Sequence, residues 1–160
     1  MKKFIFLILL LILTLACKTE VTKTLDQINP PKEVAAFFET YTKLWSEGNF
    51  GYIASDIYDL PMTLYLQDNV HYLKSPGEVK NFLTNTFNNL EANHYGFSTI
   101  NKWENYREDG KYIIVEMNFT RFLKDSTIMG NQFRKATYIL IKKNKELRIT
   151  AMMPHTIIDK

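Results

Sequence analysis

The residues that could do acid–base, nucleophilic or metal chemistry are few and widely separated in this 160-residue chain. Its three histidines, His71, His94 and His155, form none of the HxH, HxxxH or HExxH spacings that are typical of a metal site. There is no Gly-rich phosphate loop, no GxSxG motif and no conspicuous pair of carboxylates. The sequence therefore predicts no metal site and no bound cofactor.

The N-terminus carries the most specific pattern of the sequence. A basic start with Lys2 and Lys3 precedes a continuous apolar run over residues 4–13, and small residues follow it. A membrane-spanning helix needs about 20 apolar residues, so this shorter run is typical of an export signal.

The end of this leader, Thr14-Leu15-Ala16-Cys17, resembles the lipobox of bacterial lipoproteins, Leu-Ala/Ser-Gly/Ala-Cys, with Thr14 in place of the usual Leu. The resemblance implies that Cys17, the single cysteine, receives a diacylglyceryl thioether and becomes the new N-terminus. It also implies a signal peptide over residues 1–16, and a location in the bacterial cell envelope, anchored to the membrane and facing the periplasm or the exterior. The polar stretch 18–29 is expected to tether the lipidated Cys17 to a domain over residues 30–160.

The composition, 46% hydrophobic and 14% aromatic, is that of a globular domain. Lys2 and Lys3 belong to the leader, which leaves 18 Lys and Arg against 17 Asp and Glu. Such a small excess gives no electrostatic footprint for nucleic acid. With Cys17 lipidated, no thiol remains for a disulfide, so the domain must be stabilised by its core.

The hydrophobic periodicity predicts helices first and long strands afterwards. A strong amphipathic helix covers Val34–Trp45, and a short second helix is expected over Tyr52–Tyr58 and is closed by Pro61. The pattern Ser75-Pro76-Gly77-Glu78 is a capping box that opens a third helix. The expected strands are residues 62–66, 70–73, 97–106, 111–122, 133–142 and 147–153.

Because strands and helices do not alternate regularly, a parallel sheet is not expected. The order favours an α+β fold, in which about three helices of the N-terminal half pack on one face of a curved antiparallel sheet. A lipocalin-like barrel is the structural alternative, disfavoured by two substantial helices before the long strands.

This order, together with Val34–Trp45, Ser75–Val79 and the closing strands Ala136–Leu140 and Leu147–Thr150, resembles the NTF2-like superfamily, in its SnoaL-like and ketosteroid-isomerase-like group. The resemblance covers residues 31–155. It implies a cone in which helices and a concave sheet enclose a pocket, and a back face of the sheet that often forms a dimer.

Alternation along the strand from Lys111 separates two faces. Met117 and Arg121 lie on the more apolar face, together with residues 113, 115 and 119, and this face is expected to turn toward the helices. Glu116, Asn118 and Thr120 lie on the mixed face, which suits a homodimer contact. The candidate ligand-binding residues are Tyr41, Trp45, Tyr65, Trp103, Met117 and His155, although aromatic residues at such positions are more often plain core.

His155 follows the last strand in register with Leu147 and Ile149, which predicts a place at the pocket rim, unless a backbone carbonyl satisfies it. The resemblance implies a catalytic Asp in the region of Asp56 and Asp59. The match is by region only, and a role as surface residues or helix caps is favoured for both.

These observations predict an exported, lipid-anchored protein that binds a small hydrophobic or amphipathic molecule, or a partner protein, without catalysis. One alternative is a cofactor-independent isomerase, dehydratase or cyclase with Asp56 or His155 as base and Tyr41 as oxyanion donor. Another is a structural dimerisation module.

Overall fold

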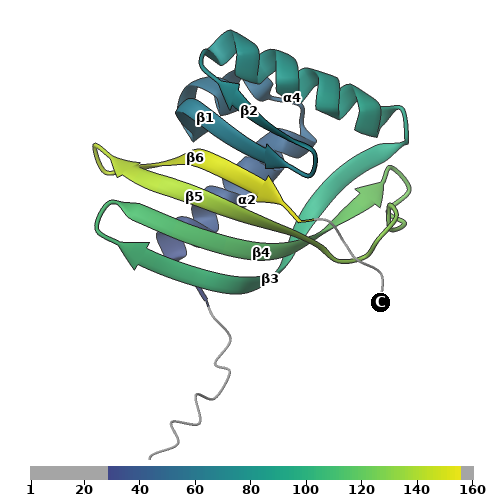
Figure 1. Cartoon of the computed structure of the whole chain (residues 1–160). Helices are drawn as coiled ribbons and strands as arrows, with labels where there is room; N and C mark the ends of the chain where they lie inside the picture. The colour runs from purple at the N-terminus through teal and green to yellow at the C-terminus, as the bar shows by residue number, and fades with distance from the viewer. Residues whose placement is uncertain (1–28, 156–160) are drawn as a thin grey trace, which may run out of the picture.

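The computed structural model describes residues 29–155 (Figure 1). The leader, Cys17 and nearly all of the predicted tether lie outside the described residues. In chain order the elements are α2 (Lys32–Ser46), α3 (Phe50–Tyr52), the π-helix η1 (Ile53–Ile57), β1 (Tyr58–Leu66), β2 (Asn69–Leu73), α4 (Pro76–Glu91), β3 (Tyr95–Asp109), β4 (Tyr112–Leu123), β5 (Arg134–Lys143) and β6 (Glu146–Pro154).

The strands form one six-stranded sheet in the order β2-β1-β6-β5-β4-β3. The predicted α+β fold is confirmed, but the sheet is mixed, because β1 pairs with β6 in parallel while every other neighbouring pair is antiparallel. Periodicity within each strand does not determine which distant strand becomes its neighbour, and so the sequence did not reveal this pairing.

The sheet is bent around α2, which crosses its concave side (Figure 1). Strand β3 carries three register shifts against β4, after Tyr95, Ile100 and Trp103. Such bulges bend a strand and increase its twist. The long outer strands therefore wrap toward the helices and create a concave inner face.

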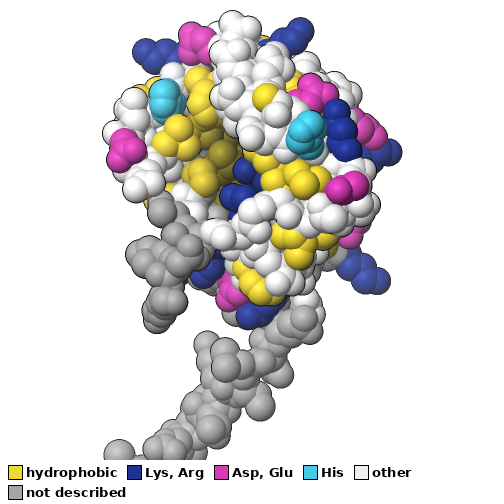
Figure 2. All heavy atoms as spheres, turned by 90° about the vertical axis from the view of Figure 1, so that its right-hand side faces the viewer, with side chains coloured by type: hydrophobic (Ala, Val, Ile, Leu, Met, Phe, Trp, Pro, Cys, Tyr) yellow, Lys and Arg dark blue, Asp and Glu magenta, His cyan; other side chains and the backbone are white. Residues whose placement is uncertain are grey.

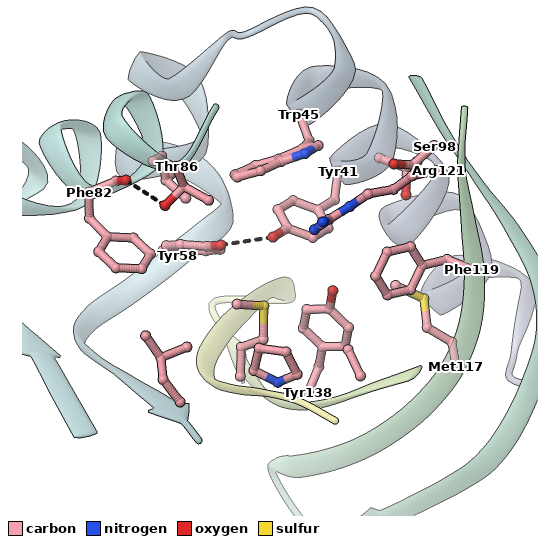
Figure 3. A pocket seen from close by; sticks show the side chains of 16 residues that line it. Tyr41, Trp45, Tyr58, Phe82, Thr86, Ser98, Met117, Phe119, Arg121 and Tyr138 are labelled. Carbon is pink, nitrogen blue, oxygen red and sulfur yellow. Dashed lines mark hydrogen bonds between the residues drawn. The ribbon is translucent and has the colours of Figure 1, made fainter. Parts of the chain in front are cut away.

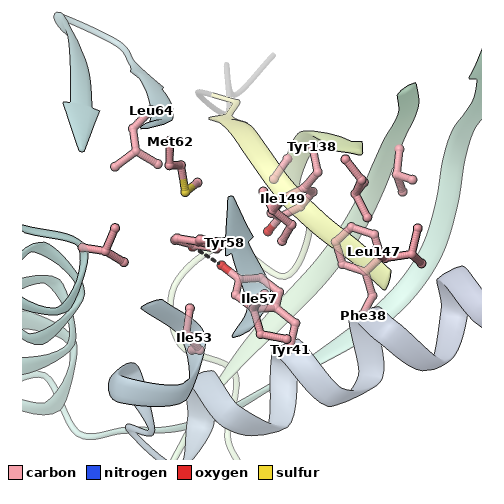
Figure 4. Close-up of a cluster of buried hydrophobic side chains, with 14 of the residues drawn as sticks. Phe38, Tyr41, Ile53, Ile57, Tyr58, Met62, Leu64, Tyr138, Leu147 and Ile149 are labelled. Atoms are coloured by element: carbon pink, nitrogen blue, oxygen red, sulfur yellow. Dashed lines mark hydrogen bonds between the residues drawn. The ribbon is translucent and has the colours of Figure 1, made fainter. Parts of the chain in front are cut away.

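The apolar stripe of α2 faces the sheet, as predicted. Val34, Phe38 and Tyr41 are buried, and the Phe38 ring meets those of Trp103 and Tyr138 edge-on, with centroids 5.6 and 5.0 Å away. Figure 4 shows Phe38 and Tyr41 directed from the helix into the cluster of buried side chains. Edge-to-face aromatic contacts of this kind fix the position of the helix as well as burying area.

The predicted capping box is confirmed at the start of α4. The Ser75 hydroxyl oxygen accepts a hydrogen bond from the Glu78 amide at 3.2 Å, and the Glu78 carboxylate accepts one from the Lys74 amide at 2.8 Å. Val79 and Leu83 are buried on the inner face of this helix. No helix in the described part of the chain is both long and apolar enough to cross a membrane.

The prediction around Pro61 is wrong. Pro61 does not close a helical segment; it lies inside β1, after a cis Leu60–Pro61 peptide bond. The parallel pairing with β6 shifts register between Tyr58 and Thr63. A proline has no amide hydrogen, and an irregular stretch of this kind can accommodate it without losing a ladder bond.

Candidate functional site

A cavity of about 150 Å³ lies between α2, α4 and the concave face of the sheet, with side chains from β1, β4, β5 and β6 in its wall. Figure 2 shows the corresponding hollow, surrounded by hydrophobic side chains and with basic atoms at its base. The fold produces it because the curved strands diverge from the straight helices, and the side chains fill the gap only in part.

The wall is mainly apolar, and about half of its apolar side chains are aromatic. Tyr41 and Trp45 line it from α2, one helical turn apart, which places both on the same face. The Trp45 ring is held by Phe50 and Phe87, with centroids 5.4 and 6.3 Å away. Met117 of β4 lines the opposite side.

Three tyrosine hydroxyl groups lie in this interior (Figure 3). The hydroxyl oxygens of Tyr41 and Tyr58 are 2.8 Å apart and share a hydrogen bond. Burial raises the pKa of Tyr41, Tyr58 and Tyr138 well above the ordinary value for a phenol. All three groups are therefore neutral at physiological pH, when each retains a proton to donate.

Arg121 adds a positive charge to the same wall. Its side chain is half-buried, and its guanidinium carbon lies 5.7 Å from the centre of the Phe119 ring. The Nε atom is buried and has no hydrogen-bond partner within the described residues. Burial and the neighbouring Arg134 lower the pKa of Arg121 from its usual value, although a guanidinium of this basicity stays charged.

No carboxylate, imidazole, amine or thiol of the described residues lines this cavity. Asp56 is exposed in η1 and accepts a hydrogen bond from its neighbour Ser55. Asp59 forms an ion pair with Lys143 at 2.9 Å. The structure therefore does not bring either acid to Tyr41, and residues 29–155 contain no cluster of three potential metal ligands.

His155 lies on the other face of the sheet, which corrects its predicted place at the rim. Its Nε2 atom is 2.7 Å from the Thr137 hydroxyl and 3.7 Å from the Glu116 carboxylate, both on the back face. The register of β6 against β5 shifts between the pairs Leu140–Ile149 and Ile139–Ala151. After a one-residue shift, alternate side chains exchange faces, so Met152 and Pro154 line the cavity instead.

Two further candidates also lie outside the cavity. Tyr65 is 40% exposed, because it alternates with Leu64 and Leu66, whose side chains turn inward. Trp103 lines a separate open groove of about 540 Å³ between α2 and β3. Of the six candidates, the structure thus gathers Tyr41, Trp45 and Met117 around the cavity, and their role in binding stays a prediction.

Tyr58, Tyr138 and Arg121 are among the wall residues that were not predicted as site residues. A signal existed for Arg121, since it is the only charged residue on the otherwise apolar face of its strand. Tyr58 and Tyr138 gave no such signal, because they reach the cavity only through the pairing of β1 and β5 with β6.

The mixed face of β4 is closely hydrogen-bonded within the chain. The Glu116 carboxylate accepts bonds from Lys135 at 3.0 Å and from Thr137 at 3.1 Å. Thr120, predicted to face outward, is buried and donates to the Gln132 carbonyl oxygen, because the connection between β4 and β5 folds over it. A homodimer through this face stays a prediction.

Three solved structures show how widespread this architecture is. A domain of unknown function with a cystatin-like fold from Nostoc punctiforme has a TM-score of 0.62 and 12% identity, and covers 82% of this chain and 81% of its own. An NTF2-like protein from Novosphingobium aromaticivorans has a TM-score of 0.61 and 10% identity, with 76% and 78% covered. Aln2 from a Streptomyces species has a TM-score of 0.62 and 12% identity, with 81% and 94% covered.

At these identities the similarity establishes the fold alone. No curated protein matches the chain. The family model described as "NTF2-like protein (DUF6841)" matches residues 32–157, which is most of the sequence. The chain therefore belongs to this NTF2-like family, DUF6841.

Proposed function

We propose that this protein is a lipid-anchored component of the bacterial cell envelope that binds a small amphipathic molecule in the cavity between α2, α4 and the sheet. The observation that carries the proposal is a mainly apolar cavity, with aromatic side chains in its wall, into which neutral tyrosine hydroxyls project. Apolar walls with a few directed polar groups are the usual composition of a small-molecule site.

The volume limits the ligand. A cavity of about 150 Å³ matches the size of engineered cavities that take up a single benzene ring. The ligand is therefore a molecule with one ring or a short chain, whose apolar body contacts Trp45 and Met117 and whose polar end meets the hydroxyl groups.

Binding without catalysis fits the wall better than the isomerase-like alternative. General-base chemistry needs a group within hydrogen-bond reach of the substrate proton. Asp56 is exposed and His155 lies behind the sheet, so neither supplies that group to this cavity.

Export and anchoring rest on the pattern of residues 1–17, in which a basic start and an apolar run end at a lipobox-like cysteine. A single acyl chain gives only marginal membrane affinity, so the proposal requires the multiple chains of a mature lipoprotein.

Fluorescence tests the binding proposal directly. The chain has two tryptophans, so Trp103→Phe leaves Trp45 in the cavity wall as the sole indole reporter. Titrating this full-length variant with cyclohexanol in dodecyl maltoside micelles should change the Trp45 emission saturably. Ala136→Phe, which fills the cavity from β5, should abolish the change, whereas the surface variant Tyr65→Ser should preserve it. A folded protein whose emission does not saturate contradicts the proposed function.

A further inference from the structure

We infer that the cavity selects ligands bearing a single carboxylate group, which the Arg121 guanidinium binds. The inference rests on the proposed function and adds the chemical class of the ligand. It depends on an uncompensated charge in the wall.

Arg121 lacks a partner of opposite charge. Within residues 29–155 its guanidinium takes part in no hydrogen bond or ion pair, and its Nε atom is sealed from solvent. The cavity wall that it shares includes no acidic side chain among the described residues. Burying an arginine without a counter-ion is unfavourable, and buried charges are ordinarily paired. A bound anion would supply the missing partner.

Arg134, on the neighbouring strand β5, is a second arginine close to this end of the cavity. Its Nε atom is also buried and unpartnered within the described chain, while its Nη2 donates to the Met129 carbonyl oxygen at 3.1 Å. Burial, together with repulsion between the two guanidinium groups, lowers the pKa of Arg121. Two like charges without an acid beside them make this end of the cavity attractive to an anion.

Among the described residues that line the cavity, Arg121 is the one charged side chain. Arg121 lines the cavity, whereas Arg134 does not and is engaged by the loop after β4. One guanidinium presents parallel N–H groups that match the two oxygens of a carboxylate. A single carboxylate is thus balanced by the one guanidinium of the described residues that lines the wall.

The surroundings define where the rest of the ligand lies. In Figure 3 the Arg121 side chain reaches from β4 toward Tyr41, and the Tyr138 hydroxyl points into the same space. The neutral hydroxyls can donate to a carboxylate held by Arg121. The apolar body then extends toward Trp45 and Met117.

A matched pair of probes tests the inference by calorimetry on the full-length chain in dodecyl maltoside, with titrations into protein-free micelles subtracted. Cyclohexanecarboxylate and cyclohexanecarboxamide have the same shape and differ in charge. The wild-type protein should bind the carboxylate at least about tenfold more tightly, the range expected for a hydrogen bond to a charged group.

Arg121→Gln should remove this preference while leaving the affinity for the amide within about twofold, which also shows that the variant is folded. Arg107→Gln, the same change at an exposed arginine of β3, should behave as wild type. Equal affinities in the wild type, or a preference that survives Arg121→Gln, overturn the carboxylate assignment and leave the proposed binding function intact. Failure of both probes to bind, by contrast, counts against the proposed function itself.

Discussion

The hydroxyl oxygens of Tyr41 and Tyr58 lie 2.8 Å apart in the interior, although the residues are 17 positions apart in the chain. One comes from the middle of α2 and the other from the first position of β1. Their contact joins α2 to β1, the strand beside the edge strand β2, and Tyr138 approaches from β5 with its ring centre 6.0 Å from that of Tyr41. This polar cluster sits in the wall of the cavity and remains protonated there.

The tyrosine cluster predicts a loss of stability at alkaline pH. The folded-state pKa values of Tyr41, Tyr58 and Tyr138 are raised, so their contribution is fully present below the unfolded value near 10 and is lost as pH rises toward the folded values. Above pH 10 each buried tyrosine should lower the free energy of unfolding by about 1.4 kcal/mol per pH unit. Urea unfolding between pH 9 and 11.5 measures this slope.

Tyr58→Phe provides the control for that slope. The variant should lose about 1 kcal/mol at neutral pH, because the Tyr41 hydroxyl loses its partner, yet show a shallower alkaline decline. Tyr65→Phe, at an exposed position, should change neither quantity. An alkaline slope that is the same in all three proteins contradicts the burial of the cluster.

The packing of α2 against the sheet predicts that truncating Phe38 strongly lowers the stability of the protein. This side chain is fully buried and meets Trp103, Tyr138 and Tyr41. Phe38→Ala should cost about 3–5 kcal/mol of unfolding free energy in urea titration. Phe133→Ala, at a site 59% exposed, should cost less than about 1 kcal/mol, and equal losses at the two sites would rule out the packing described here.

The close approach of the backbone at Gly96 predicts that a side chain at this position lowers the stability of the protein. A Cβ atom there would lie 2.7 Å from the Leu123 carbonyl oxygen, at the end of β4 that carries Arg121. Gly96→Ala must therefore push the two strands apart, and we expect a loss of about 1–3 kcal/mol together with weaker carboxylate binding. Gly51→Ala, where an added Cβ meets nothing within 4 Å, is the matched substitution and should be tolerated. Similar melting temperatures for the two variants would contradict the close approach at Gly96.

Much of the fold could be predicted from local sequence patterns, whereas the composition of the site depends largely on the pairing of distant strands. The stripe of α2 and the capping box at Ser75 depend on neighbours three and four residues away, and both were predictable. The placement of His155 depends on a register shift in β6 that alternation along the strand does not reveal.

The residues of the cavity wall also divide into those that local patterns predict and those that long-range strand pairing places there. Tyr41, Trp45 and Met117 follow from the inner faces of one helix and one strand. Tyr58 reaches the cavity only because β1 joins β6 in parallel, a contact between distant parts of the chain. Arg121 was on the predicted inner face, but the sequence did not reveal that no acidic side chain of the described residues lines the cavity beside it.

The proposed anchor makes its own prediction at Cys17. Cys17→Ala removes the thiol that accepts the lipid, so the protein should leave the membrane fraction when bacterial cells are fractionated. Metabolic labelling with a palmitate analogue should mark the wild-type protein and not the variant. Thr14→Leu, which restores the usual lipobox residue, should keep the label, and membrane retention of unlabelled Cys17→Ala would refute lipid anchoring.

Soaking a crystal with 4-bromobenzoate shows where a carboxylate ligand binds, since bromine can be located by its anomalous scattering. We expect one bromine between Trp45 and Met117, with the carboxylate on the Arg121 guanidinium. Bromine found only in the open groove beside Trp103, or a carboxylate directed away from Arg121, would contradict this expectation.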